Sequence, residues 1–432
     1  MCGKGRSLAD MKRLARAIAT NDVAGVVDEE WLMGANVEEL GSWPFPRENP
    51  MLPPPEYDRR REQCPISKVR MWDGSEAWLL TRYADIRKAL REKCLSSDSS
   101  VDHFPAPNGA IAMARKVQRG FTRLDGEAHS RQRNLLAKYF TISHVNTMRT
   151  IVEAKVEELL DEMEAKGDTI DLVEHLALPL PIYLTCVLLN LSVEDAPYLL
   201  DRVMTWMSSD STPEDSAKGA DDIIVYFAKA IEKEKANPGE GMVAELVHEH
   251  VAQGRISEDE LLWMLHLLLV GGFDTAANMI SLGTLTLLNN PAEIQRMRDD
   301  SSRIPAVVEE LLRMHSVAHF TAGRMALDDV EIGEARICKG QGVLAPLPAA
   351  NHDPEIFPEP EKFCPDRNAR AHLAFGFGIH QCLGQPVARL ELSIVFDRLF
   401  RRFPTLRVAV PQAKLEYTNS MIYGLKSLPV TW

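Results

Sequence analysis

Residues Phe375–Glu391 read FGFGIHQCLGQPVARLE, and no other segment constrains the chain as strongly. Three glycines, Gly376, Gly378 and Gly384, surround Cys382, which stands just before a run with a helical pattern. Glycines let a loop turn tightly and let its backbone approach a flat cofactor. A cysteine near a helix N-terminus has its thiolate form favoured by the helix dipole and by free backbone N–H groups. The stretch therefore predicts a tight loop that presents a thiolate.

The order F-x-x-G-x-H-x-C-x-G, followed by A-R-x-E, resembles the haem-binding loop of the cytochromes P450. The resemblance implies a haem b cofactor whose iron takes Cys382 as its axial ligand, beside Phe375, Gly376 and Gly384. A thiolate ligand pushes electron density onto haem iron and favours O–O cleavage. His380 would reach a haem carboxylate rather than the iron. The alternatives are a buried core thiol and a zinc site, for which no second Cys or His stands at ligand spacing beyond His380.

The same resemblance implies a mainly α fold with small β-sheets, in which an α-rich haem domain adjoins a smaller β-rich region. It extends from about Trp43 to Trp432, with details closest to the bacterial-type enzymes. We expect residues 44–432 to form one haem domain, preceded by an extension, residues 1–43, of unknown role. Basic and apolar residues alternate over Lys4–Ile18, which predicts a short amphipathic helix, either a surface arm or an organelle-targeting presequence.

Local patterns divide the rest of the chain. Two alternating runs around Asp73-Gly74 predict a hairpin over Lys68–Arg82. The remaining pattern is mainly helical over Tyr83–Arg313, strand-like over Glu331–Ala350, Pro-rich and irregular over Pro354–Asp366, helical over Gln385–Phe403, and strand-like in two short closing runs. The clearest helices are Val145–Ala165, Ser257–Leu288 and Ala292–Met297, with N-caps at Ser257 and Asn290-Pro291.

Upstream of the cysteine, Glu310-Leu311-Leu312-Arg313 resembles the family's E-x-x-R helix. Glu310 and Arg313 share a helix face and can pair. Alone the motif says little, because most such pairs are solvated surface contacts. Arg367, in the stretch FCPDR, matches the family's third partner, and the resemblance implies that the three residues lock the irregular segment behind the haem loop.

Cationic residues are expected around the haem carboxylates. His129 and Arg133, in DGEAHSRQR, are spaced i, i+4 and point the same way along a helix. Buried carboxylates need such donors, and arginine suits them by its fork geometry. The resemblance implies that His129, Arg133, Arg324 and His380 hold the haem carboxylates. The alternative for each is an ordinary surface charge.

The apolar run Leu261–Leu288 carries an acid and a hydroxyl, Asp274 and Thr275, which are costly to bury unpaired. The resemblance implies an oxygen-binding groove here. Gly272 would let the helix widen, Thr275 would hydrogen-bond iron-bound oxygen and Asp274 would relay protons. Ala276 stands where many members carry a second Thr or Ser. The alternative is a Thr bonded to its i−4 carbonyl and an Asp in a structural salt bridge.

The composition of the chain limits which kinds of partner and which compartment we expect. The chain has 432 residues and a net charge of −13, which argues against nucleic acid or an anionic membrane surface as a partner. Its seven cysteines are scattered and form no C-x-x-C, so we expect a reducing intracellular compartment. The run Leu261–Leu288 is apolar enough for a membrane span, but His266, Asp274 and Asn278 favour a buried core helix.

The resemblance implies a monooxygenase that acts on a small molecule. No nicotinamide or iron–sulfur motif is visible, so we expect the electrons to come from a ferredoxin and its reductase. The ferredoxin would dock near Arg131, Lys138 and Arg389. We also expect a monomer. The alternative for these three basic residues is an ordinary solvated surface. One alternative is nitric oxide reduction with NADH, as in similar fungal enzymes, which lack the acid before the Thr. Another is a haem-binding sensor or carrier without turnover.

The substrate pocket is expected from family position. It would draw on the Val101–Lys116 loop, the Val317–Thr321 segment and Met421-Ile422, with His266, Leu268, Gly271, Val317, His319 and Ile422 as the named contacts. Most are apolar, which fits a mainly hydrophobic small molecule. His319 is the polar exception, and a core histidine satisfied by backbone is an equal alternative for it.

Overall fold

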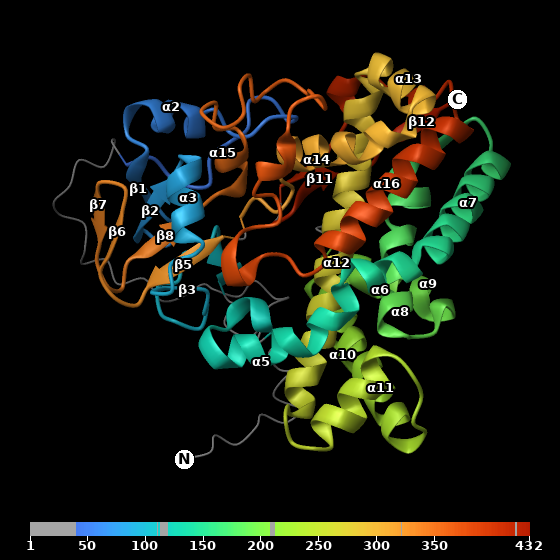
Figure 1. Ribbon diagram of the computed structural model, residues 1–432, viewed down its shortest axis with the longest axis horizontal. Helices are drawn as coiled ribbons and strands as arrows, with labels where there is room; N and C mark the ends of the chain where they lie inside the picture. The colour runs from blue at the N-terminus through green and yellow to red at the C-terminus, as the bar shows by residue number, and fades with distance from the viewer. Residues whose placement is uncertain (1–39, 110, 113–119, 208–211, 321, 420) are drawn as a thin grey trace.

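The computed structural model describes residues 40–109, 111–112, 120–207, 212–320, 322–419 and 421–432. The helix expected within Lys4–Ile18 lies outside the described residues. A helical body stands beside a smaller β-rich region (Figure 1), which confirms the predicted fold class. The helices are α2 Glu56–Gln63, α3 Tyr83–Ala89, α5 Gly126–Ala137, α6 Ile142–Thr147, α7 Arg149–Lys166, α8 Pro179–Leu189, α9 Ala196–Met207, α10 Pro213–Ala236, α11 Met242–Glu245, α12 Glu258–Leu288, α13 Pro291–Asp299, α14 Ile304–His315, α15 Leu347–Asn351 and α16 Gln385–Arg402.

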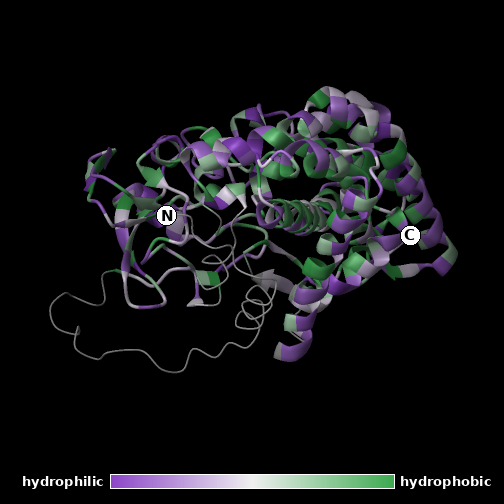
Figure 2. Ribbon diagram, turned by 90° about the horizontal axis from the view of Figure 1, so that it is seen from below, coloured by the Kyte–Doolittle hydropathy of each residue, from purple (hydrophilic) through white to green (hydrophobic). Residues whose placement is uncertain are grey.

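The long helix α12 forms the axis of the body. It starts where predicted, in a capping box: the Glu260 N–H donates to Ser257 Oγ at 3.1 Å and the Ser257 N–H donates to the Glu260 carboxylate at 2.9 Å. The helix packs against α8, α14 and α16, and apolar residues cluster around it in the view of Figure 2. Among the described residues it is the one helix with the length and apolarity of a membrane span, yet 61% of its most apolar window is buried inside the molecule. The expectation of a core helix agrees with this packing.

The strands form small sheets. A five-stranded sheet has the order β1-β2-β8-β5-β3, a three-stranded sheet the order β4-β12-β9, and β6-β7 and β10-β11 are two-stranded. The strands are β1 Ile66–Arg70, β2 Glu76–Leu80, β3 Leu95–Ser96, β4 Thr169–Asp171, β5 Gly323–Ala326, β6 Val330–Ile332, β7 Ala335–Ile337, β8 Gly342–Leu344, β9 Arg407–Val408, β10 Tyr417–Asn419, β11 Tyr423–Leu425 and β12 Pro429–Thr431. The predicted hairpin is confirmed, because β1 and β2 pair antiparallel around Gly74, which has a φ of +81°.

Two local expectations were wrong. The strand-like run Glu331–Ala350 ends in helix α15, because Pro348 fits the first turn of a helix. The closing region contains four short strands, β9 to β12, rather than two. The Pro-rich stretch Pro354–Asp366 contains neither helix nor strand, as predicted.

The folded body begins a little before the expected boundary at residue 44. The Arg70 N–H donates to the Gly41 carbonyl at 3.0 Å. Trp43 is buried, and its ring packs edge-on against Phe320 at a centroid distance of 5.1 Å. Residues from Gly41 onward therefore belong to the packed structure.

Candidate active site

The Cys382 loop is shaped by its glycines. Gly376 and Gly378 have φ values of +70° and +76°, a region that other residues rarely adopt. A Cβ on Gly378 would lie 2.6 Å from the Leu90 carbonyl oxygen, so the loop packs closely on the end of α3. The Cys382 N–H donates to the Phe375 carbonyl at 2.8 Å. These contacts place the cysteine just ahead of α16, as the sequence predicts.

The Cys382 side chain faces the interior of the molecule. Cys382 keeps accessible surface, but the protein that surrounds it raises the pKa of its thiol. We infer that this accessible surface faces a space enclosed by the protein rather than bulk water. The backbone N–H groups of Gly384 and Gln385, with Arg133 and Arg389, act in the opposite direction and lower this pKa. The thiolate therefore has donors and cations arranged to stabilise it.

Two arginines near this loop are shielded from water, Arg324 fully and Arg123 in part. Burial lowers the pKa of Arg123 to about 10. Burial and the nearby Arg123 together lower the pKa of Arg324 to about 10. Within the described residues neither side chain forms a salt bridge, and Arg324 only donates to the Gly323 carbonyl, at 2.8 Å. A buried guanidinium without an acid is costly, so this pair calls for anionic groups.

Two histidines lie beside these arginines. The rings of His129 and His380 are 4.4 Å apart. Among the residues that the structure describes, neither nitrogen of the buried His129 has a well-aligned hydrogen-bond partner, and His380 Nδ1 also lacks one. Burial lowers the pKa of His129 to about 4, although the Ile379 carbonyl opposes this. The other nitrogen of His380, Nε2, lies 3.3 Å from Asp125 Oδ1 rather than being free for a cofactor.

Asp125 is the acid of this cluster. Burial alone would raise its pKa, but bonds from His380, Ser96 and the Ser97 N–H lower it to about 2. The Asp125 carboxylate acts on the guanidinium group of Arg324. Within the described residues Arg123 has no such acid beside it, and Arg133 donates to the Gln381 carbonyl at 2.7 Å. The two carboxylates of a haem would supply the missing negative charge, so the residues present fit that group. Sequence reasoning missed Arg123, although its place two residues before Asp125 offered a signal.

The predicted three-residue clamp is formed. Arg313 Nε and Nη2 donate to the Glu310 carboxylate, both at 2.8 Å, and Arg367 Nε donates to the same carboxylate at 3.0 Å. Glu310 and Arg313 have no exposed side-chain surface. Sequence reasoning missed Asn351, whose Oδ1 accepts the Leu373 N–H at 2.6 Å and whose carbonyl accepts Arg313 Nη1 at 2.9 Å. Asn351 thereby joins the clamp to the start of the Cys382 loop.

The middle of α12 differs in part from expectation. Gly271 and Gly272 are exposed within an otherwise buried helix, but α12 is regular throughout, so the predicted widening at Gly272 does not occur. The Thr275 hydroxyl donates to the Gly271 carbonyl at 2.9 Å, which is the i−4 bonding that the structural alternative required.

Asp274 forms no salt bridge among the residues described, contrary to that alternative. Asn278 Nδ2 donates to its Oδ1 at 2.7 Å and to its carbonyl at 2.8 Å. Burial raises the pKa of Asp274 to about 6, with the Asn278 bond opposing. The carboxyl group can therefore take up and release a proton near neutral pH.

Two segments expected at the substrate pocket lie side by side. The Tyr423 N–H donates to the Val317 carbonyl at 2.8 Å, which joins the segment from Val317 to the hairpin that contains Ile422. His319 stacks on Phe320, with ring centroids 3.7 Å apart. Leu268 and Gly271 keep exposed surface on α12. Part of the Val101–Lys116 loop lies outside the described residues.

His266 lies in an aromatic cluster. Its ring is 5.4 Å from the rings of both Trp206 and Trp263. Burial lowers its pKa to about 4, so it is neutral at pH 7. These contacts give His266 a packing environment and do not by themselves place it against a ligand.

The basic set expected to meet an electron donor is paired within the chain. Arg131 pairs with Glu260, Lys138 with Glu245, and Arg389 with Glu309. By contrast, Arg87 and Arg91 form no ion pair within the described ranges. Their guanidinium carbons lie 4.4 and 5.9 Å from the ring centroid of Phe377 in the Cys382 loop.

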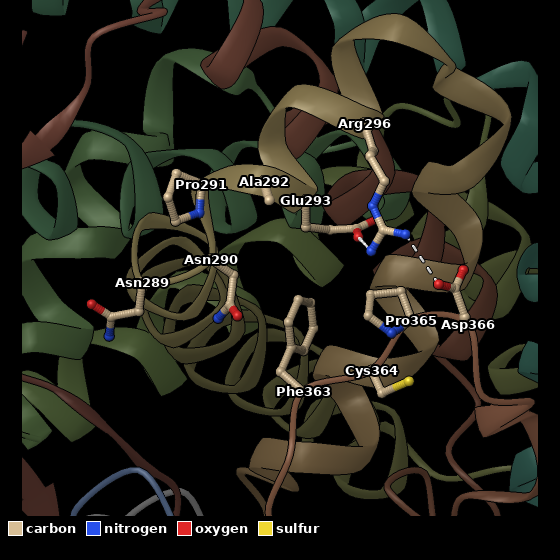
Figure 3. Close-up of a pocket in the computed structure, with 10 residues that line it drawn as sticks. All are labelled: Asn289, Asn290, Pro291, Ala292, Glu293, Arg296, Phe363, Cys364, Pro365 and Asp366. Atoms are coloured by element: carbon tan, nitrogen blue, oxygen red, sulfur yellow. Dashed lines mark hydrogen bonds and ion pairs between the residues drawn. The ribbon is translucent and has the colours of Figure 1, made fainter.

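A separate hollow of about 330 Å³ lies between α13 and residues 363–366. In Figure 3 Arg296 reaches from α13 toward Asp366, and the two side chains approach to 3.1 Å. None of the residues that line it belongs to the Cys382 loop, the cation cluster or the middle of α12. It is therefore not part of the candidate active site.

Comparisons with known proteins agree with this geometry. The sequence profile described as "Cytochrome P450" matches residues 196–422. Cytochrome P450-SU2 of Streptomyces griseolus is 37% identical over 89% of this chain and 94% of its own length. Cytochrome P450 55A3 of the fungus Fusarium lichenicola is 34% identical over 90% and 97%. The crystal structure of mycinamicin VIII C21 methyl hydroxylase from Micromonospora griseorubida is 32% identical, covers 91% of this chain and 100% of its own, and superposes with a TM-score of 0.84.

Proposed function

The chain belongs to the cytochrome P450 family, and from this premise we propose that it inserts one oxygen atom from O2 into a mainly hydrophobic small organic substrate. Membership makes it a haem-thiolate oxidoreductase whose axial ligand is Cys382, the cysteine of the family loop. The observation that carries the proposal is the pair Asp274–Thr275 on α12. A carboxyl group with a pKa raised to about 6 is suited to deliver protons during oxygen activation.

Haem, when bound, supplies the redox chemistry, and the protein positions it and meters protons. We assign Arg123, Arg133, Arg324 and His129 to the haem carboxylates. Each brings positive charge or an unpartnered nitrogen to one cluster. The Glu310–Arg313 pair holds the segment that leads into the Cys382 loop. We also assign His380 to the haem carboxylates, through Nδ1, because its Nε2 already contacts Asp125.

On α12, Asp274 holds the proton to be delivered and Asn278 fixes its carboxyl oxygen. The Thr275 hydroxyl is the next donor along the helix. Its hydrogen is used in the bond to the Gly271 carbonyl, so this bond would have to open before the hydroxyl could donate to a molecule in the site. A Cβ on Gly271 would meet nothing within 4 Å, so we infer that open space for a substrate lies beside this turn, whereas a Cβ on Gly272 would contact Thr185 Oγ1 of α8 at 3.3 Å.

The proposed substrate is a small, mostly apolar molecule. Leu268, Val317 and Ile422 supply apolar surface, and His319 offers a polar contact. The name of the similar structure from Micromonospora griseorubida describes hydroxylation of a methyl group of mycinamicin VIII. By analogy we propose a tailoring role in secondary metabolism. We assign His266 no direct contact with the substrate, because its ring packs against two tryptophans.

We propose that a ferredoxin and its reductase supply the electrons. An acidic ferredoxin would find Arg87 and Arg91 available beside Phe377, whereas Arg131 and Lys138 are already paired. We further propose a monomer that works inside the cell, with one haem domain that begins near Gly41 and is preceded by an extension.

The second candidate is nitric oxide reduction with NADH, which the 34% identity to the fungal relative supports. Asp274 favours the first candidate, since reduction of nitric oxide does not need O–O cleavage. The experiment supplies purified protein either with ferredoxin, reductase, NADPH and O2, or with NADH and nitric oxide. Substrate oxidation in the first mixture supports the proposal, and rapid NADH oxidation in the second overturns it. No turnover in either, with haem bound, would favour a sensor or carrier.

A further inference from the structure

Glu309, next to the clamp residue Glu310 on α14, makes a second set of contacts. Arg389 of α16 donates to its carboxylate twice, from Nε at 2.5 Å and from Nη2 at 3.0 Å. His372 Nε2 lies 3.2 Å from the same carboxylate. A two-bond contact of this kind fixes the plane of the guanidinium as well as its distance. Glu309 thereby determines how Arg389 lies.

His372 reinforces this arrangement. The Ala374 N–H donates to His372 Nδ1 at 3.1 Å, so Nδ1 is the acceptor and Nε2 carries the proton that faces Glu309. Burial alone would raise the pKa of Glu309, but the adjacent His372 and the bonds from Arg389 lower it to about 2. Glu309 is therefore an ionised carboxylate at neutral pH, and the ion pair with Arg389 is intact.

Arg389 in turn lies on the Cys382 loop. Its guanidinium carbon is 4.7 Å from the ring centroid of Phe375, and its Nη1 donates to Gln385 Oε1 at 2.9 Å. The carbonyl of Phe375 accepts the Cys382 N–H at 2.8 Å. The positive charge of Arg389 also favours the thiolate form of Cys382. Arg389 thus touches the residue that holds the cysteine and acts on the sulfur through its charge.

We propose that Glu309 is a positioning residue that sets the reduction potential of the haem iron, by holding Arg389 over the ring of Phe375 and neutralising its charge beside Cys382. The inference concerns the haem held by Cys382 and does not depend on the substrate or on the reaction proposed above. Positive charge near the thiolate stabilises the reduced iron, so Glu309 and Arg389 act in opposite directions. The pair is only partly exposed, so salt screens it weakly.

The test is a redox titration of the full-length, haem-loaded protein, read from the absorbance of the ferric and ferrous forms without substrate. Glu309→Gln should raise the ferrous-to-ferric ratio at a fixed potential about tenfold, which is 59 mV for a one-electron couple. Arg389→Leu should lower the ratio by a similar factor. The double variant removes both charges, leaves no unpaired buried charge, and should return to within about twofold of the parent protein.

Arg389→Lys separates position from charge, because lysine keeps the charge but cannot lie flat on a ring while forming two parallel bonds. It should shift the ratio in the same direction as Arg389→Leu, by a smaller factor. Arg402→Gln is the matched control: Arg402 is at the other end of α16 and pairs with Asp161 and Glu164. Single variants that bind haem fully and keep the parental ratio would overturn the proposal and leave a plain ion pair between α14 and α16. An unshifted Arg389→Lys would overturn the positioning role.

Discussion

Gly424 of β11 lies so close to Asn278 of α12 that a Cβ at position 424 would be 1.4 Å from Asn278 Oδ1. Asn278 is the residue that holds Asp274. The absence of a side chain on the hairpin therefore determines where the amide, and through it the carboxyl group, can lie.

Gly424→Ala should accordingly push Asn278 away and loosen Asp274. We expect a loss of about 1–3 kcal/mol in the free energy of unfolding, since the clash is with a packed side chain, together with slower turnover. Urea denaturation and steady-state rates measure the two effects. Adding Asn278→Ala removes the atoms nearest the new methyl group and should restore part of the stability. If Gly424→Ala alone is as stable as the parent, the contact is not a constraint.

Cys382→Ser should abolish the absorption band of a thiolate-ligated, CO-bound haem, because a neutral hydroxyl is a poor donor to ferrous iron. The measurement is the difference spectrum of the reduced protein with and without CO. Cys364→Ser serves as the control, since Cys364 lies in a different segment near Glu310. A Cys382→Ser protein with the parental band would contradict axial ligation by this residue.

Arg123→Ala and Arg324→Ala should each weaken haem binding. Loss of either guanidinium leaves a haem carboxylate without its partner in a buried place, which costs on the order of 2–5 kcal/mol. Haem content after purification and the rate of haem transfer to an acceptor globin report the effect. Arg336→Ala, at a side chain that is 72% exposed, should change neither. Full haem retention in both buried-site variants would return these arginines to a structural role.

Thr275→Ala should keep the CO spectrum and still consume reductant and oxygen, while releasing hydrogen peroxide instead of oxidised substrate. Positioned proton transfer contributes roughly 10²–10⁴-fold in rate, and Thr275 is not needed to hold haem. The measurement is product formed per reductant consumed. Thr185→Ala, on α8 near Gly272, is a matched removal of a hydroxyl that is bonded to its own helix. Coupling equal to the parent protein would count against the role of Thr275.

Asp274→Asn should stabilise the fold above pH 6 but not near pH 4. The pKa of Asp274 is raised from 3.8 to about 6, so the folded state favours the protonated form and wild-type stability falls as pH rises between these values. An amide has no such penalty. The advantage of the variant should therefore grow from pH 4 to 6 and level off on the order of 2–3 kcal/mol. Parallel unfolding curves with a pH-independent gap would show that Asp274 is not a buried acid of this kind.

The sequence predicted those features that depend on a few neighbouring residues. Ser257 and Glu260 predict the start of α12, Asp73-Gly74 predicts a hairpin, and the spacing around Cys382 predicts the haem loop. The sequence did not predict the contacts between segments that lie far apart along the chain. Asn351 looks like an ordinary residue just after a strand-like run, and it becomes part of the clamp only through its contacts with Arg313 and Leu373. In the same way, the sequence does not reveal that Nε2 of His380 contacts Asp125, 255 residues away, which leaves only Nδ1 for a cofactor.

The five-stranded sheet has a consequence for biosynthesis. Its neighbours β2 and β8 come from opposite ends of the domain, and Trp78 Nε1 donates to Gln341 Oε1 at 2.8 Å across 263 residues. While the ribosome is still making the middle of the chain, β2 therefore has an open edge. Such long-range pairing forms slowly and leaves nascent protein prone to aggregation. We expect the β-rich region to be the last to assemble, and expression yield to depend more on slow synthesis or chaperones than on the helices.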